Sequence, residues 1–316
     1  MCPISPSVEI SGFCNLRCLA CPRSDTLHPF ETGGFMSLTD YEKVLNKLVK
    51  EIPMLHMMNL FIWSDPLLHP NLPDIIKMNS NLGLGSFLST NLNIKTEKLD
   101  DIIKSDPPYL KITCSGFGSK NYEMNQAGAK WELFYKNILE VSRLIKKYKA
   151  STAVEIFFLI TKENIMEYKD IVKLGQENGF RVSAGLSMLF PKYAMDFIEN
   201  MPLHEGAQKA MSLMSRDLKE MLSAAEKEHD RLCANRIGFP NINWDLSVLN
   251  CCNFNQDKLA DNFFDKSIKE LIEMKDRSPL CKKCISYSLH RYSNVQSNIT
   301  YVQDLLLETT GLPPYI

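Results

Sequence analysis

The stretch Cys14-Asn-Leu-Arg-Cys18-Leu-Ala-Cys21 places three thiols close together, directly after the apolar run Val8-Glu-Ile-Ser-Gly-Phe13. Structural zinc sites and most iron–sulfur clusters use four protein ligands. These thiols are one short, and the next cysteine along the chain is Cys114. A [4Fe-4S] cube held by three cysteines keeps one iron open, where a substrate or cosubstrate can chelate. The spacing therefore predicts a catalytic cluster.

The pattern C-x3-C-x2-C on a loop after a first strand resembles the signature of the radical S-adenosylmethionine (SAM) enzymes. In that family the open iron binds the amino and carboxylate groups of SAM. An electron from the cluster cleaves SAM to methionine and a 5′-deoxyadenosyl radical, which abstracts a substrate hydrogen. The resemblance implies that Cys14, Cys18 and Cys21 bind this cluster, that SAM is the cosubstrate, and that an external donor such as flavodoxin or ferredoxin supplies the electron.

Other segments resemble cofactor-contacting turns of the same family. Trp63-Ser-Asp-Pro66 lies where the family has a Gly-Gly-Glu-Pro-like turn against the SAM amino group, and Asp65 replaces the glutamate. Ala20 occupies a position, often aromatic, whose backbone contacts the adenine. Each of these residues, taken singly, is equally compatible with a simple strand-ending turn. The resemblance assigns cofactor contacts to Ala20, Asp65, Ser89, Asn91 and Ser115.

Apolar runs of strand length alternate with amphipathic helical patterns along the first 200 residues. This alternation predicts an α/β fold with a parallel sheet, a partial (β/α)6 TIM-like barrel whose chemistry lies at the C-terminal ends of the strands. The strands are expected at 8–13, 57–63, 84–90, 109–115, 153–160 and 180–188, and the helices near 37–52, 72–82, 95–105, 129–149 and 164–178.

Beyond the barrel (1–200) the pattern changes. A linking helix is expected at 201–232, a small module of β-hairpin and helix at 233–300, and a surface tail at 301–316. Two β-like runs flank Asp245-Leu-Ser and predict the hairpin, and a helix is expected at 267–276.

Five of the ten cysteines lie in the expected second module. Four thiols can close a metal site, and the hairpin between the first two resembles the SPASM/twitch extensions of radical SAM enzymes. A SPASM module with two clusters needs more cysteines, so the resemblance implies a twitch-type module with one auxiliary [4Fe-4S] cluster. Zinc is the alternative, because C-x2-C pairs also build zinc ribbons. The expected ligands are Cys233, Cys251, Cys281 and Cys284.

Composition excludes several classes of function. The net charge of −1 provides no field for a polyanion, and the basic stretch 143–149 follows an amphipathic helical pattern, so nucleic-acid binding is not expected. Neither a signal peptide nor a membrane-spanning segment is recognisable. We therefore expect a cytoplasmic protein without membrane contacts. Clustered cysteines in a reducing cytosol favour metal binding over disulfides.

Two classes of reaction fit these features. In the first, the enzyme oxidises or epimerises a polar small molecule, such as a sugar or aminocyclitol, with a layout similar to 2-deoxy-scyllo-inosamine dehydrogenase. In the second, it is a peptide maturase, acting on a ribosomally made precursor. Maturases often carry a leader-binding domain before the barrel, whereas 13 residues precede Cys14 here, which favours a small substrate. A zinc-stabilised interaction protein is the non-enzymatic alternative.

Two further thiols are candidates for a catalytic role. An epimerase needs a hydrogen donor on the second face of its substrate, and a cysteine S–H bond is weak enough to serve. Cys252 adjoins an expected cluster ligand, and Cys114 stands at an expected strand end. Packing as small apolar residues is the alternative for both.

Overall fold

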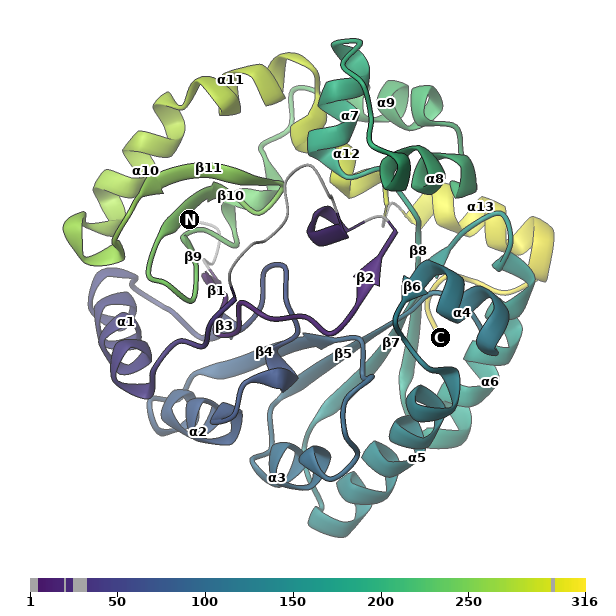
Figure 1. The fold of residues 1–316 in the computed structure, drawn as a ribbon, viewed down its shortest axis with the longest axis horizontal. Coiled ribbons are helices and arrows are strands. Elements are labelled where there is room, and N and C mark those ends of the chain that lie inside the picture. The colour runs from purple at the N-terminus through teal and green to yellow at the C-terminus, as the bar shows by residue number, and fades with distance from the viewer. Residues whose placement is uncertain (1–4, 20, 25–32, 297–298) are drawn as a thin grey trace.

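The computed structural model describes residues 5–19, 21–24, 33–296 and 299–316. Its centre is a nine-stranded sheet in the order β11-β10-β9-β1-β3-β4-β5-β7-β8. Neighbours from β1 to β8 are all parallel, which confirms the expected partial (β/α)6 barrel (Figure 1). These six strands are β1 (Ser7–Val8), β3 (Met57–Asn59), β4 (Gly85–Thr90), β5 (Tyr109–Cys114), β7 (Ala153–Ile160) and β8 (Arg181–Leu186).

Amphipathic helices form a ring outside these strands (Figure 1). The first helix begins where Ser37 caps it by accepting the backbone N–H of Asp40 at 3.0 Å, and its residues Tyr41 and Val44 are buried in the core. The five expected helices are confirmed as α1 (Leu38–Glu51), α2 (Leu72–Asn81), α3 (Lys98–Lys104), α5 (Trp131–Tyr148) and α6 (Tyr168–Asn178). The short α4 (Ser119–Asn125) precedes α5.

Alternation along the strands separates an outer face from an inner one. Ser86 of β4 accepts a hydrogen bond from Asn79 of α2. The face of β4 that carries Ser86 is therefore the outer face, which the helices cover. Thr90 shares that face and is paired in register with Ile112 of β5. On β5 the alternate residues Lys111 and Thr113 lie on the opposite, inner face, where they are half-buried.

The expected linking helix at 201–232 is instead two helices, α8 (Glu205–Leu213) and α9 (Leu218–Glu226), which follow α7 (Pro191–Ile198). The break has two causes. Met214 leaves the helix to form a β-bridge with Thr161. Asp217 then caps α9 by accepting the backbone N–H of Lys219 at 2.8 Å.

The C-terminal hairpin joins the barrel sheet. β9 (Asn241–Ile242) pairs in parallel with β1, with Val8 opposite Ile242. Antiparallel β10 (Val248–Cys251) and β11 (Phe254–Ala260) extend the sheet beyond it. The expected helix at 267–276 is confirmed as α10 (Ile268–Arg277), followed by α11 (Pro279–Ser286) and α12 (Leu289–Val295). Barrel and hairpin therefore share one sheet.

The last residues are not a surface tail. The helix α13 (Ile299–Thr310) leads into a segment that pairs antiparallel with β8. Val182 donates its backbone N–H to Ile316 at 2.8 Å, and Ile316 donates back to Val182 at 3.0 Å. This pairing satisfies backbone groups on the edge strand of the barrel, which would otherwise lie open to other chains.

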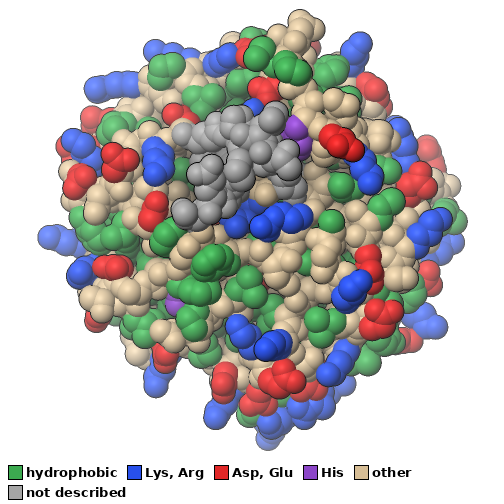
Figure 2. Space-filling model, viewed as in Figure 1, with side chains coloured by type: hydrophobic (Ala, Val, Ile, Leu, Met, Phe, Trp, Pro, Cys, Tyr) green, Lys and Arg blue, Asp and Glu red, His purple; other side chains and the backbone are tan. Residues whose placement is uncertain are grey.

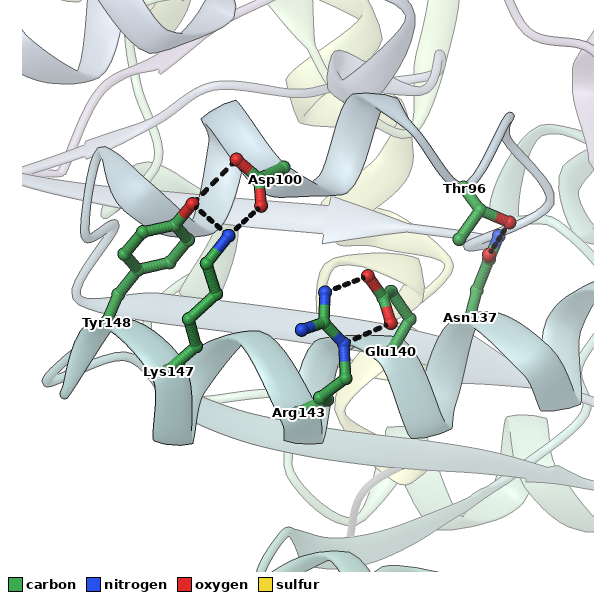
Figure 3. A network of polar contacts seen from close by, with 7 residues as sticks. All are labelled: Thr96, Asp100, Asn137, Glu140, Arg143, Lys147 and Tyr148. Atoms are coloured by element: carbon green, nitrogen blue, oxygen red, sulfur yellow. Dashed lines mark hydrogen bonds and ion pairs between the residues drawn. The ribbon is translucent and has the colours of Figure 1, made fainter.

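Charged side chains of both signs are interspersed around the rim of the molecule (Figure 2). The basic stretch 143–149 is a solvated helix face, as expected. Arg143 pairs with Glu140 at 2.7 Å, and Lys147 pairs with Asp100 of α3 at 2.8 Å (Figure 3). Among the described helices, none is both long and apolar enough to cross a membrane.

Candidate functional site

The loop with the first three cysteines crosses the C-terminal end of the barrel. It leaves β1 and runs over the centre of the ring to β2 (Arg17–Cys18) (Figure 1). There β2 pairs antiparallel with β6 (Gln126–Ala127), and Leu19 donates its backbone N–H to Asn125 at 3.2 Å. The loop is thus anchored on both sides of the barrel mouth.

All three thiols of this loop are half-buried in an environment that disfavours thiolates. Burial raises the pKa of Cys18 well above its usual range, and the neighbouring Cys21 and Cys14 raise it further. Burial also raises the pKa of Cys21 to about 11. The pKa of Cys14 is raised by burial and, to a smaller extent, by the nearby carboxylate of Asp65. Three thiols that repel one another as anions need a bound cation to be held deprotonated together. A metal cluster meets this requirement.

No group of three or more Cys, His, Asp or Glu side chains in the described part of the chain is arranged around a single metal ion. A cube differs from a single ion, because each thiolate binds a different iron.

Asn91, at the end of β4, links the cysteine loop to the barrel. Its side-chain amide donates to the Cys14 thiol at 3.8 Å and to Asn15 at 3.0 Å, while its oxygen accepts the backbone N–H of Asn93 at 2.7 Å. Asn91 is 9% exposed. These bonds hold Asn91 against the cysteine loop, and its expected contact with the cofactor stays a prediction.

Asp65 holds the backbone of Asn91 in place. Its buried carboxylate accepts the backbone N–H of Asn91 at 3.0 Å, the hydroxyl of Thr90 at 2.8 Å and the backbone N–H of Leu67 at 3.0 Å. The last bond caps the short 3₁₀ turn η2 (Pro66–Leu68). These donors occupy both oxygens, so the structure gives Asp65 a positioning role, and its contact with a cofactor stays a prediction.

Glu9 is a site residue that the sequence reasoning missed. It follows β1, is 4% exposed, and accepts the backbone N–H groups of Trp63 and Ser64, the latter at 3.0 Å. Burial raises the pKa of the Glu9 carboxyl to about 7, and these hydrogen bonds and the guanidinium of Arg23 act in the opposite direction. A lone acid in the apolar run Val8–Phe13 was the available signal.

Arg23 completes this group. Its guanidinium donates to the Ser64 hydroxyl at 3.1 Å and to the Gly12 carbonyl at 3.0 Å. The end of the cysteine loop is thereby tied to the turn after β3.

Ser115 and Ser89 occupy different settings. Ser115 is buried, and its backbone N–H donates to the side chain of Gln126 at 3.1 Å. It lines a cavity of about 70 Å³ together with Cys18 and Thr161. The hydroxyl of Thr161 is buried there without a hydrogen-bond partner among the described residues. Ser89 lies half-buried on the inner face of β4, whereas Ala20 lies outside the described residues.

Cys114 does not face the barrel interior. It ends β5 as expected, but it shares the outer face with Ile112 and is fully buried. Its thiol donates to the Gly116 carbonyl at 3.0 Å, and burial raises its pKa to about 12. A hydrogen donor must reach the substrate, so the predicted donor role of Cys114 is wrong. The alternation of side chains along β5 puts Cys114 on the face that packs into the core.

The second cysteine set surrounds a cavity of about 540 Å³. Its walls include the segment before β9, the strand β10 and the helices α10 and α11, which Figure 1 shows on one side of the barrel. Cys251 lines the cavity, and the half-buried Cys252 lies beside it. All four thiols expected to act as ligands are brought together here: Cys233, Cys251, Cys281 and Cys284.

Polar groups around this cavity act on the thiols. A hydrogen bond from Cys252, supported by the ammonium of Lys275, lowers the pKa of Cys251 below its usual range. The backbone N–H of Asn253 donates to the Cys251 sulfur at 3.4 Å, and the Cys281 thiol donates to the Asn250 side chain at 3.6 Å.

Two residues of α12 hold the segment that carries Cys233. The imidazole of His290 lies 3.1 Å from the carbonyls of His229 and Arg231. Arg291 donates to the Leu232 carbonyl at 2.7 Å and pairs with Glu228 at 2.7 Å. These bonds position Cys233 at the cavity from outside its own segment.

Comparison with known proteins adds the fold relationship. No family model matches the chain, and no curated protein sequence does. Among solved structures, anSMEcpe with bound AdoMet matches with a TM-score of 0.58 and 15% identity, covering 98% of this chain and 99% of that one. SuiB of Streptococcus suis, bound to precursor peptide SuiA, matches with a TM-score of 0.60 and 15% identity, covering 90% and 67%.

The chain has the fold of these proteins. A third structure, anSMEcpe with bound AdoMet and the Cp18Cys peptide, matches at a TM-score of 0.56 and 15% identity over 98% and 99% of the two chains. At such identity the likeness shows the fold alone.

Proposed function

We propose that this protein is a radical SAM enzyme that abstracts hydrogen from a polar small molecule, of the sugar or aminocyclitol kind, and so oxidises or epimerises an alcohol. The observation that carries the proposal is the loop of Cys14, Cys18 and Cys21 across the C-terminal end of a partial barrel. AdoMet-bound structures of the same fold support it.

The residues of the first site fit a cluster and its cosubstrate. Cys14, Cys18 and Cys21 would hold a [4Fe-4S] cluster with SAM at its open iron, and this pair would supply a 5′-deoxyadenosyl radical. The chain itself orients the thiols: Asn91 donates to Cys14, and Asp65 holds Asn91. The unpartnered hydroxyl of Thr161 in the nearby cavity is a polar group that a bound ligand would satisfy.

The second site fits a closed metal centre. Cys233, Cys251, Cys281 and Cys284 would hold an auxiliary [4Fe-4S] cluster, which would provide a destination for the electron released when an alcohol is oxidised. The arrangement of the cysteines supports this assignment, since four thiols from three segments line the same cavity. Zinc is the alternative occupant, but it would need these thiols gathered around one ion, and no such group occurs among the described residues.

Peptide modification is the second candidate function. The observation in its favour is that two proteins of this fold were solved with peptides, SuiB with precursor peptide SuiA and anSMEcpe with the Cp18Cys peptide. It requires the same SAM chemistry and differs only in the substrate.

The deciding experiment replaces Cys14, Cys18 and Cys21 with Ala and measures 5′-deoxyadenosine from SAM under a reductant such as dithionite or reduced flavodoxin. The wild-type protein should form it, and the triple variant should not, because the irons of the four-thiolate second site have no open position to chelate SAM. Cys114→Ala is the matched control, since Cys114 is a buried thiol outside both sites. Undiminished cleavage in the triple variant would refute the proposal.

Product analysis then separates the reactions. A ketone formed from an alcohol indicates a dehydrogenase, and a mass change in a precursor peptide indicates a maturase. Cys252 remains our candidate hydrogen donor for an epimerase, because it is half-buried beside Cys251. Solvent deuterium that enters the product of wild-type enzyme, and is lost in Cys252→Ala, would establish epimerisation.

A further inference from the structure

Lys275 is a buried cation in the wall of the second cysteine cavity. It lies on α10, is 5% exposed, and shares the cavity of about 540 Å³ with Cys233, Cys251, Cys281 and Cys284. Its ammonium donates to the backbone carbonyl of Asn250, the residue before Cys251, and lies 5.1 Å from the centre of the Phe239 ring. These contacts fix the charge close to β10.

This charge has no carboxylate within 4.0 Å in the part of the chain that the structure describes. The nearby acids are engaged elsewhere. Asp276 pairs with Arg236 at 2.6 Å, and Asp257 accepts from the Asn250 side chain at 2.6 Å. A buried ammonium is costly unless it is compensated. The cysteines of the cavity, as thiolates, are the available counter-charge.

We propose that Lys275 supplies the positive charge that offsets these four thiolates and thereby raises the reduction potential of the cluster they hold. The inference rests on the proposed function. A [4Fe-4S] centre becomes more negative on reduction, and its potential depends on net charge and solvent exposure. A cation held in a poorly solvated wall stabilises the reduced form more than the oxidised form. Lys275 thus makes the auxiliary site a better electron acceptor.

The test uses protein in which Cys14, Cys18 and Cys21 are all replaced by Ala, so that only the second site can contribute a signal. Lys275→Met removes the charge and keeps the length of the side chain, whereas Lys275→Arg keeps the charge. The midpoint potential of each is measured by redox titration followed by electron paramagnetic resonance. Iron and zinc are counted in the same samples.

Lys275→Met should lower the ratio of reduced to oxidised cluster at a fixed potential at least about tenfold, which is about 59 mV for one electron. Lys275→Arg should stay within about threefold of the parent. Arg236→Met is the matched control. Arg236 lines the same cavity but is half exposed and already paired with Asp276, so its removal should change the ratio much less than that of Lys275.

The outcomes separate the inference from the proposed function. Zinc, or no iron, in the parent triple variant would refute the auxiliary cluster and the inference with it. About four irons per chain and an unchanged potential in Lys275→Met would overturn the inference alone. Loss of iron in Lys275→Met but not in Lys275→Arg would support it, because the charge would then be required to assemble the site. Loss in both would overturn it.

Discussion

Trp244 lies so close to Gly34 that a Cβ on the glycine would overlap the indole ring. A Cβ on Gly12 would overlap the same ring, and Gly12 donates its backbone N–H to Gly34 at 2.7 Å. Trp244 belongs to the turn between β9 and β10, and Gly12 stands just before Cys14. The hairpin of the second site therefore rests on the loop that carries the first one.

Gly34→Ala should lower the free energy of unfolding by about 1–3 kcal/mol, because the added methyl group overpacks this contact. Urea unfolding of the cluster-free protein measures the effect. In a Trp244→Ala background the same change should cost little, since the ring it strikes is gone. Equal costs in the two backgrounds would show that the indole contact is not the cause.

Glu9 should make stability depend on pH. Its folded pKa, about 7, lies above the ordinary value of 4.5, so the folded protein binds the proton more tightly than the unfolded chain. The stability that this proton contributes is present at low pH and is lost as pH rises from about 5 through about 7. Glu9→Gln is neutral throughout and should remove this slope.

The measurement is urea unfolding of cluster-free wild type and Glu9→Gln at pH 5, 6, 7 and 8. The stability of Glu9→Gln relative to wild type should rise across this range by at most about 3 kcal/mol. All other titrating groups, the thiols included, are common to both proteins and cancel in the difference. Parallel pH profiles would mean that Glu9 does not carry the raised pKa.

Cys114 should resist alkylation in the folded state. Only thiolates react, and this thiol is fully buried with its pKa raised to about 12. With iodoacetamide at pH 8, peptide mass spectrometry should find Cys114 labelled at least about a hundredfold more slowly in native cluster-free protein than in urea. Labelling of native Cys114 as fast as of the half-buried Cys14 would contradict the outward placement of β5's last residue.

Local patterns in the sequence were enough for the barrel. The five helices and the strands after the first follow from hydrophobic periods of 2 and 3.6, because an element must bury its apolar face whichever neighbour covers it. The first strand, expected at 8–13, is shorter and earlier, at Ser7–Val8. The three-cysteine motif is equally local, since Cys14, Cys18 and Cys21 lie on one short loop and can be recognised without any distant residue. The hairpin around Asp245 was predicted for the same reason.

Only the tertiary structure decided which surfaces meet. Glu9 becomes buried because the turn at Trp63 and Ser64 closes over it. Lys275 enters the wall of the cysteine cavity because α10 packs beside β11 and α11, from where its side chain reaches the Asn250 carbonyl. The outward side of Cys114 depends on which face of β5 the helices cover, and the pairing of Ile316 with Val182 depends on an edge strand left open by the barrel. These outcomes join residues far apart along the chain, and no local period encodes such contacts.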